Sequence, residues 1–333
     1  MDKYTHPIPY ISQPEEISND DYHNSNAYSE FISSTQLKWY KTSPLYYKHC
    51  KDNGGKKIGL EARMKGSLYH DMLAAIANHG DIMRYKDNWF VFEPPMNEKT
   101  GNPYGITSAK YINEYECQKY INPGKDVTSN AEVIQCMAMV NHLISGNPHY
   151  SSIIRLWLKW GSAEQSHFIN YKKHGFKFRT DLKTKKLIID WKTSDIDDLH
   201  ESTIRQQVNK FNYGISAAFY QYFDHLLTGV WRPFKWVFQQ KKAPFDFVIV
   251  DAGEWAYKVE KDHKTGEQLI YPGPDALTFK NLLDQHLWCH DNNVFHGASS
   301  FIPPDFKGYR EMTGNIPGYM KNNLLTFYNN DRP

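Results

Sequence analysis

Three residues in one short segment have the types and spacing needed for metal-assisted chemistry. In GFKFRTDLKTKKLIIDWKTS, Asp181 ends one expected strand, and Asp190 and Lys192 end the next after a short turn. A hairpin would bring both carboxylates near one sheet edge, and residues two apart share a face of their strand. Carboxylate oxygens are the ligands that Mg²⁺ prefers, and a lysine can hold or activate a water.

The alternative for an isolated Asp-x-Lys is a solvated hairpin with a surface ion pair. Here the strand LIIDWK is apolar up to its charged pair, so Asp190 and Lys192 fall at the end of a buried run. Charged groups in such a position are costly unless they are paired or hold a cation. This context favours a functional site.

The elements that must position this segment follow a clear order. Ser33 and Gln36 have capping-box spacing, and helices are expected over 66–80 and 129–146. Residues 162–194 read as a three-strand antiparallel meander, followed by one long helix over 202–227. Two further strands and a helix complete a single α/β domain with a central mixed sheet flanked by helices. We expect an N-terminal arm at 1–30, this domain at 31–294 and a C-terminal tail at 295–333.

Composition restricts the function classes. The chain has 333 residues and a net charge of +2, which excludes a protein that coats nucleic acid by bulk charge alone. Its four cysteines form no C-x-x-C pair, so a disulfide framework or zinc ribbon is not expected. Neither a signal-peptide core nor an apolar run approaching ~18 residues is visible. We therefore expect a soluble, cytoplasmic protein without a membrane partner.

The spacing of the candidate residues resembles the core of the PD-(D/E)XK nuclease superfamily. Further segments resemble its RecE-type (exonuclease VIII-like) branch, which is related to the nuclease domain of RecB. The matching segments, in order, are SSTQLKWYKTSPLYYKHC, GSLYHDML, GSAEQSHF, DWKTSDID and NYGISAAFYQYF. Each is weak alone, but together they span about residues 33–225 and imply a restriction-endonuclease-like fold.

The resemblance implies a set of metal-binding groups: the carboxylates of Asp181 and Asp190, the Trp191 carbonyl, His70 and Glu164. Lys192 would polarise the attacking water, and Mg²⁺ is the implied cofactor, with Mn²⁺ able to substitute. His70 lies off the apolar stripe of its helix, which would let it face a cleft. The alternative for His70 is a half-buried structural histidine, and the alternative for Glu164 is a surface glutamate.

Two positions depart from the family pattern. Thr180 replaces the proline that gives the superfamily its name, and Ser216 stands where the family has a glutamine four residues before a tyrosine. Gln206 and Gln207 lie nearly three turns earlier and are the candidates to replace it. Tyr213 and Tyr220 are the remaining candidates on this helix, with core packing as the alternative.

Basic residues gather around the predicted site. From residue 172 to 192 there are eight lysines and arginines against two acids. This excess is typical of a surface that contacts the phosphate backbone of DNA, although lysines also decorate ordinary hairpin turns. The expected DNA-binding residues here are Lys172, Lys173, Lys183, Lys185 and Lys186.

The resemblance implies an exonuclease that digests one strand of double-stranded DNA, 5′→3′. The remaining 3′-ended strand would supply a single-strand annealing protein in phage or prophage recombination, in the bacterial host cytoplasm. Family members form rings around DNA, so a homo-oligomer is expected. The alternatives are a RecB-like or structure-specific endonuclease, a DNA-binding protein with a degenerate site, and a hydrolase of small phosphoesters.

Overall fold

A mixed β-sheet forms the centre of the molecule. The computed structural model describes residues 10–11, 17–53, 55, 60–295 and 297, so the predicted tail lies almost wholly outside the described residues. The sheet order is β1-β4-β5-β6-β7-β8, with β6 and β7 parallel and the other neighbours antiparallel. Its strands are β1 (Tyr10–Ile11), β4 (Ser162–Tyr171), β5 (His174–Lys183), β6 (Ile188–Ser194), β7 (Phe234–Gln240) and β8 (Phe247–Asp251).

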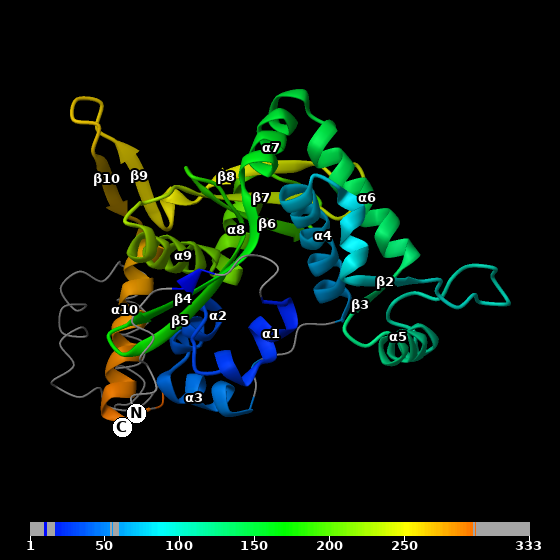
Figure 1. Ribbon diagram of the computed structural model, residues 1–333, viewed down its shortest axis with the longest axis horizontal. Helices are drawn as coiled ribbons and strands as arrows, with labels where there is room; N and C mark the ends of the chain where they lie inside the picture. Colours follow the sequence, from blue (N-terminus) through cyan, green and yellow to red (C-terminus); the bar gives the residue numbers. More distant parts are fainter. Residues whose placement is uncertain (1–9, 12–16, 54, 56–59, 296, 298–333) are drawn as a thin grey trace, which may run out of the picture.

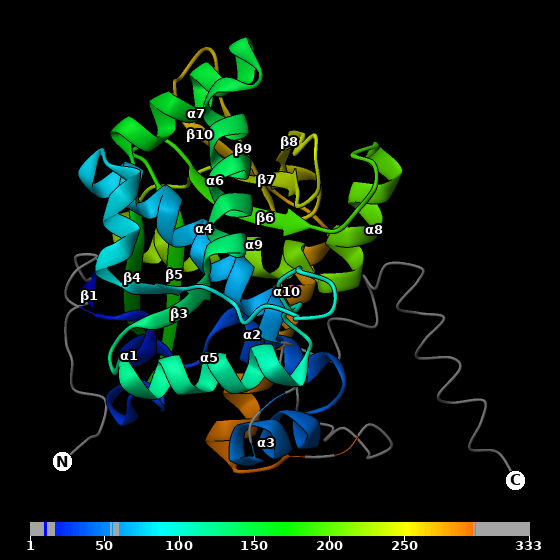
Figure 2. The same cartoon turned by 90° about the vertical axis from the view of Figure 1, so that its right-hand side faces the viewer.

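Helices cover both faces of this sheet, which confirms the predicted fold class (Figures 1 and 2). The α-helices are α1 (Asn19–Asn24), α2 (Ser34–Lys38), α3 (Pro44–Asn53), α4 (Leu60–His79), α5 (Ala109–Ile121), α6 (Asn130–Ser145), α7 (Pro148–Trp160), α8 (Glu201–Phe211), α9 (Tyr213–Thr228) and α10 (Pro274–Asn292). Short 3-10 helices lie at Asn26–Tyr28, Trp39–Lys41, Ile82–Asp87 and Ala252–Glu254. Among the described residues, no helix combines the length and apolar character needed to cross a membrane.

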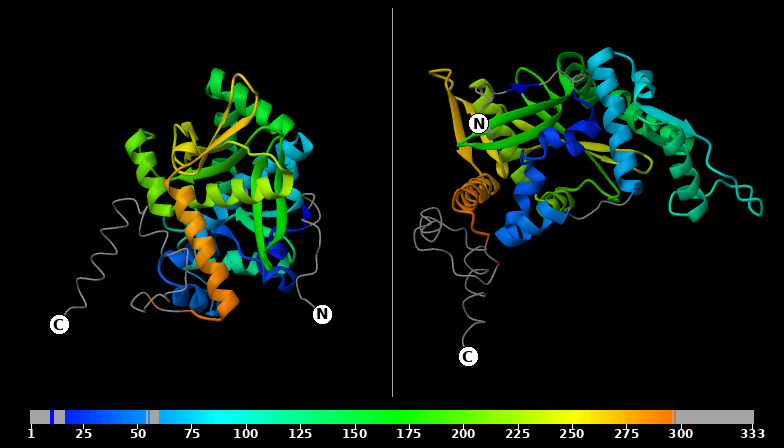
Figure 3. Two further views of the ribbon diagram at one scale, coloured as in Figure 1. Left: turned by 90° about the vertical axis from the view of Figure 1, so that its left-hand side faces the viewer. Right: turned by 60° about the horizontal axis from the view of Figure 1, so that its bottom comes forward.

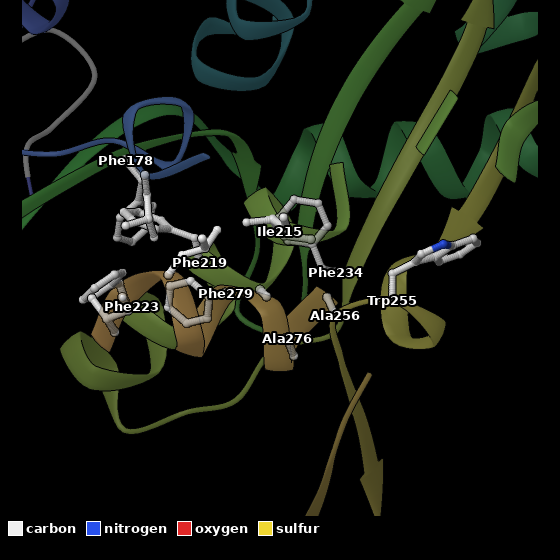
Figure 4. Packing of buried hydrophobic residues seen from close by; sticks show 14 of the residues in the cluster. Phe178, Ile215, Phe219, Phe223, Phe234, Trp255, Ala256, Ala276 and Phe279 are labelled. Carbon is white, nitrogen blue, oxygen red and sulfur yellow. The ribbon is translucent and has the colours of Figure 1, made fainter. Parts of the chain in front are cut away.

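The sheet separates two apolar cores. One, the α9-side core, packs α9 and α10 on the sheet and is rich in aromatic rings (Figure 4). Phe219 and Phe223 have ring centres 4.6 Å apart, and both contact Phe279 of α10. The other, the α4-side core, packs α4, α6 and α7 and includes Leu182 and Trp191 of the sheet. Two packed faces hold β5 and β6 in fixed positions.

The predicted long helix over 202–227 is wrong in one respect, because the chain forms two helices there. α8 ends at Phe211, and α9 begins at Tyr213. Asn212 between them is left-handed, with φ 52° and ψ 45°, a conformation that asparagine tolerates better than most residues. The apolar repeat continues through the break, so periodicity alone predicts one helix.

Two segments that gave no clear sequence signal form small sheets. β2 (Trp89–Phe92) pairs in parallel with β3 (Asp126–Ser129), and with α5 they form an extension that projects from the body (Figure 3). β9 (Tyr257–Lys261) and β10 (Gln268–Pro272) form an antiparallel hairpin. Neither small sheet joins the central sheet.

The described part of the predicted N-terminal arm packs on the central sheet. β1 pairs with β4, and the Arg179 side chain donates to the carbonyls of Ile17 and Ser18 at 2.9 and 3.3 Å. Lys177 donates to the carbonyls of Tyr22 and Tyr28 at 2.7 and 3.1 Å. These contacts place the segment after residue 17 against β4 and β5. The domain boundary at residue 30 stays a prediction.

A buried histidine cluster predicts how acid affects stability. His286 of α10 is fully buried, with its Nδ1 3.1 Å from the Tyr40 hydroxyl, and its ring centre lies 4.3 Å from that of His290 and 5.5 Å from that of His174. Burial first, and then these two histidines, lower the pKa of His286 well below its ordinary value. The unfolded chain therefore takes up this proton more readily than the folded one. This contribution to stability is present above about pH 6.5 and is lost as the pH falls.

The expected result is that, between pH 7 and pH 5, the urea midpoint of the unchanged protein falls relative to that of His286→Phe. The comparison with this variant matters because carboxyls with raised pKa values, such as that of Asp190, act in the opposite direction. An equal pH dependence in both proteins would contradict the assignment to His286.

Candidate active site

Asp181 and Asp190 face each other across the β5–β6 hairpin. Leu182 pairs with Ile189 and Lys183 with Ile188, and this register places the two aspartates opposite each other. The Asp181 carboxylate also accepts a hydrogen bond from the Trp191 backbone N–H at 2.8 Å. The pKa of Asp190 is raised to about 7, mainly by burial. The charge of Lys192 lowers this pKa, and the charge of the neighbouring Asp181 raises it further. The two carboxyls are therefore close enough for their charges to repel.

Lys192 lies directly beside this acidic pair. Its Nζ is 2.7 and 2.6 Å from the two carboxylate oxygens of Asp190, and 4.9 Å from the ring centre of Tyr213. Burial disfavours the ammonium form, but Asp190 and then Asp181 outweigh it and raise the pKa of Lys192. Ile188 packs into the α9-side core while Ile189 and Trp191 pack into the α4-side core. Asp190 and Lys192 thus share one face of β6, as their spacing predicts.

A second group of ligand atoms adjoins Asp181. Among the described residues, one group of histidine, cysteine and acidic side chains could hold a metal ion: His70, Glu164 and Asp181, with ligand atoms within 4.8 Å of one another. His70 Nδ1 is 3.6 Å from the Asp181 carboxylate. Its Nε2 is 3.0 Å from the Trp191 carbonyl, which can only accept, so Nε2 carries the hydrogen and Nδ1 faces the carboxylate.

The Trp191 carbonyl contacts a second candidate ligand. The resemblance implies that this oxygen contacts a metal, which stays a prediction, and it accepts a hydrogen bond from His70. It therefore orients the imidazole of a candidate ligand, which is how the outer groups around metal sites commonly act. Burial, and next the charge of Lys192, lower the pKa of His70, so the ring is neutral at pH 7.

Glu164 reaches the site through an irregularity in β4. Its φ is +54°, unusual for any residue other than glycine. The neighbouring pairs of β4 and β5 are Ala163 with Leu182 and Gln165 with Thr180, while Glu164 and Asp181 do not pair in this ladder. Burial, and next Asp181, raise the pKa of Glu164 well above its ordinary value. Strained backbone of this kind concentrates at functional sites.

Near this irregularity, the side chains of β5 also change the core that they face. Residues four apart in a regular strand share a face, yet Phe178 packs into the α9-side core and Leu182 into the α4-side core. Asp181 lies between them, where neither core encloses it fully. The polar residues thus occupy the point at which the apolar packing of β5 changes face.

His70, Glu164 and Asp181 line a pocket of about 260 Å³, to which the N-terminal segment also contributes, whereas Asp190 and Lys192 are not among its lining residues. The wall includes Tyr22 and Ser34, and Tyr220 of α9 closes one side. The Tyr220 ring lies 5.2 Å from that of Phe178, so it both packs in the core and borders the pocket. The packing of Tyr220 is thus observed, while its functional role stays a prediction.

Two site residues escape the sequence patterns. Asp71 lines the pocket, accepts a hydrogen bond from the Trp89 indole at 2.6 Å, and has a pKa raised by burial to about 6. Lys38 donates to Ser216 at 2.9 Å, at the position where the family has glutamine. Asp71 follows His70 directly, so its place in the chain could have marked it as a candidate site residue. The contact of Lys38 with Ser216 joins residues 178 positions apart, and sequence spacing does not predict it.

The predicted glutamine substitutes do not line this pocket. Gln206 is exposed and Gln207 is half-buried, both on α8. Neither belongs to the described pocket wall. The break at Asn212 separates α8 from the helix that carries Tyr213 and Tyr220, and the substitution by Gln206 or Gln207 stays a prediction.

The basic residues of the hairpin divide into exposed and internal groups. The side chain of Lys183 is only 11% exposed and pairs with the buried Asp224 at 3.0 Å, which corrects its assignment to DNA binding. The exposed lysines are Lys172, Lys173, Lys185 and Lys186. The first two lie between β4 and β5 and the last two between β5 and β6, so β5 separates them by its full length.

Comparisons with known proteins give a distant structural likeness. No protein-family model matches the sequence, and no curated protein matches it. A crystal structure from Eubacterium rectale with the description "Putative exonuclease" is 13% identical, with a TM-score of 0.49. The similarity covers 86% of this chain and 91% of that chain. Function is therefore inferred from the geometry of the site itself.

Proposed function

We propose that this chain is a metal-dependent deoxyribonuclease of the PD-(D/E)XK type. One observation supports the proposal most: Glu164, Asp181 and His70 form a metal-ligand group directly beside the Asp190–Lys192 pair. Acidic ligands next to a lysine, at an accessible pocket, suit phosphodiester hydrolysis better than a purely structural ion pair.

The donor set fits a hard divalent cation. Glu164 and Asp181 offer carboxylate oxygens and His70 offers a neutral nitrogen, and the raised pKa of Glu164 reflects burial and the repulsion of Asp181. A divalent cation would relieve this repulsion. We propose Mg²⁺, with Mn²⁺ able to substitute, held by these residues and by Asp190. When bound, the ion supplies a more acidic water and stabilises charge on the phosphate oxygens.

The protein groups have separate tasks in this proposal. The Lys192 ammonium has three donors, which can hold the attacking water and stabilise charge on the phosphate. Asp190 fixes its position through two short contacts. His70 is oriented by the Trp191 carbonyl, and Tyr220 borders the place where a phosphate would lie.

We further propose a RecE-like exonuclease that acts 5′→3′ on double-stranded DNA. The exposed Lys172, Lys173, Lys185 and Lys186 would contact the phosphate backbone away from the acidic pocket. The product, a 3′-ended single strand, would supply a single-strand annealing protein in the bacterial cytoplasm. Assembly into a homo-oligomeric ring would allow processive digestion.

Comparison of linear and covalently closed DNA tests this function. With Mg²⁺, linear duplex should be degraded and its 5′ label released first, while closed circles stay intact. EDTA should stop the reaction, and Asp181→Asn should remove it without changing the circular-dichroism spectrum. Nicked or linearised circles would indicate an endonuclease instead. DNA binding without cleavage in Mg²⁺ and Mn²⁺ would contradict the enzyme proposal.

A further inference from the structure

An exposed aromatic ring lies at the end of a row that leads to Lys192. Phe211, the last residue of α8, is 44% exposed, whereas most phenylalanines of this fold lie in the cores. Its ring stacks on Tyr213, with centres 5.4 Å apart and an angle of 26° between the planes. Tyr213 in turn lies 4.9 Å from the Lys192 amine. The row connects the surface with the candidate active site.

Side chains from α2 and from the 3-10 helix that follows it hold the chain at Phe211 and Asn212. Lys38 donates to the Phe211 carbonyl at 3.3 Å and to Ser216 at 2.9 Å. Lys41 donates to the Asn212 side chain, at the left-handed residue that joins the two helices. A ring fixed in this way loses little conformational freedom when it binds a ligand, which favours binding.

The charge around the row is positive. Lys210 lies 5.2 Å from the Phe211 ring centre, and Lys38 and Lys41 bind the Phe211 carbonyl and the Asn212 side chain. Asp275 offsets part of this charge, since it acts on both Lys38 and Lys41. An exposed aromatic face beside lysines is the combination that proteins use to bind single-stranded nucleic acid, by stacking on bases and attracting phosphates.

We propose that Phe211, supported by Tyr213, is a stacking platform for an unpaired base of the DNA strand that occupies the active site. The inference rests on the proposed nuclease function and adds the requirement for a separated strand. A flat ring among cations suits a nucleobase with its phosphates better than an apolar protein segment. The platform would position the strand next to Lys192 without contributing to the chemical step.

Binding of a fluorescent single-stranded oligothymidylate in EDTA tests the platform without cleavage. Phe211→Ala should weaken binding roughly five- to a hundredfold, the range for one stacked base, while Phe211→Trp should retain it. Tyr120→Ala is the matched control, because Tyr120 is 88% exposed on α5 and lies outside this row, and it should bind like the unchanged protein. Thermal melting of each variant checks folding.

A second measurement compares cleavage rates for a series of duplexes. Each duplex carries a single abasic site at a different position of the cleaved strand. The unchanged protein should lose rate, mainly through KM, at one position near the cut, and Phe211→Ala should show no such position. If nothing is cleaved but Phe211→Ala still weakens oligothymidylate binding, the nuclease proposal falls and the platform stands. Equal binding by Phe211→Ala and Phe211→Trp, or loss only in Tyr120→Ala, would overturn the platform.

Discussion

Asp190→Asn is expected to slow DNA cleavage by at least about 10³-fold, the equivalent of several kcal/mol of lost charge stabilisation. The substitution keeps the shape of the side chain but removes a negative charge from the proposed cation site and the ionic partner of Lys192. Because the pKa of Asp190 is already raised to about 7, the fold should tolerate a neutral side chain. Single-turnover cleavage of labelled linear duplex in saturating Mg²⁺ measures the effect.

The matched control is Asp251→Asn. Asp251 also pairs with a lysine on the sheet, Lys235, at 3.0 Å, but it is exposed and lies at the end of β8. Its substitution should leave the cleavage rate within about twofold, because surface ion pairs contribute little. Near-normal cleavage by a folded Asp190→Asn protein would refute the site.

Lys192→Met is expected to lower the cleavage rate on the order of 10²-fold or more, as for loss of a group that acts directly in the reaction. The variant keeps the aliphatic part of the side chain and removes the amine beside Asp190. Binding of Mn²⁺, followed by calorimetry, should persist because the proposed ligands remain. The effect should appear in kcat, since the amine acts on the water and the phosphate.

Lys183→Met controls for the loss of a buried lysine from the same hairpin. Lys183 pairs with buried Asp224, which keeps Arg232 at 2.5 Å as a second partner. This variant should melt at a lower temperature but cleave DNA at a near-normal rate while folded. Equal rate losses in the two lysine variants would assign the effect of Lys192 to stability.

The local part of the site could be predicted from the sequence. Asp181, Asp190 and Lys192 lie on two strands joined by a short turn, so residue spacing determines which side chains meet. Glu164 was accessible only through the resemblance, because a left-handed residue within a strand has no signal in the alternation of side chains. The mixed sheet followed in the same way from the order of short strands and helices.

The remainder depends on contacts between distant parts of the chain. The break at Asn212 interrupts a continuous apolar repeat, and it moves α8 away from the direction that a single helix would take. The internal roles of Lys177, Arg179 and Lys183 depend on partners from α9 and from the N-terminal segment. Their sequence neighbourhood shows only a run of positive charge, and this is why the basic surface was predicted too large.

The lining of the pocket by Tyr22 and Ser34 has a consequence for which part of the chain is needed to complete it. Tyr220 of α9, which also lines the pocket, lies almost two hundred positions after Tyr22 in the chain. Asp181, another lining residue, lies between them in the chain. A chain that stops before α9 therefore lacks Tyr220 and the complete pocket of the proposed nuclease.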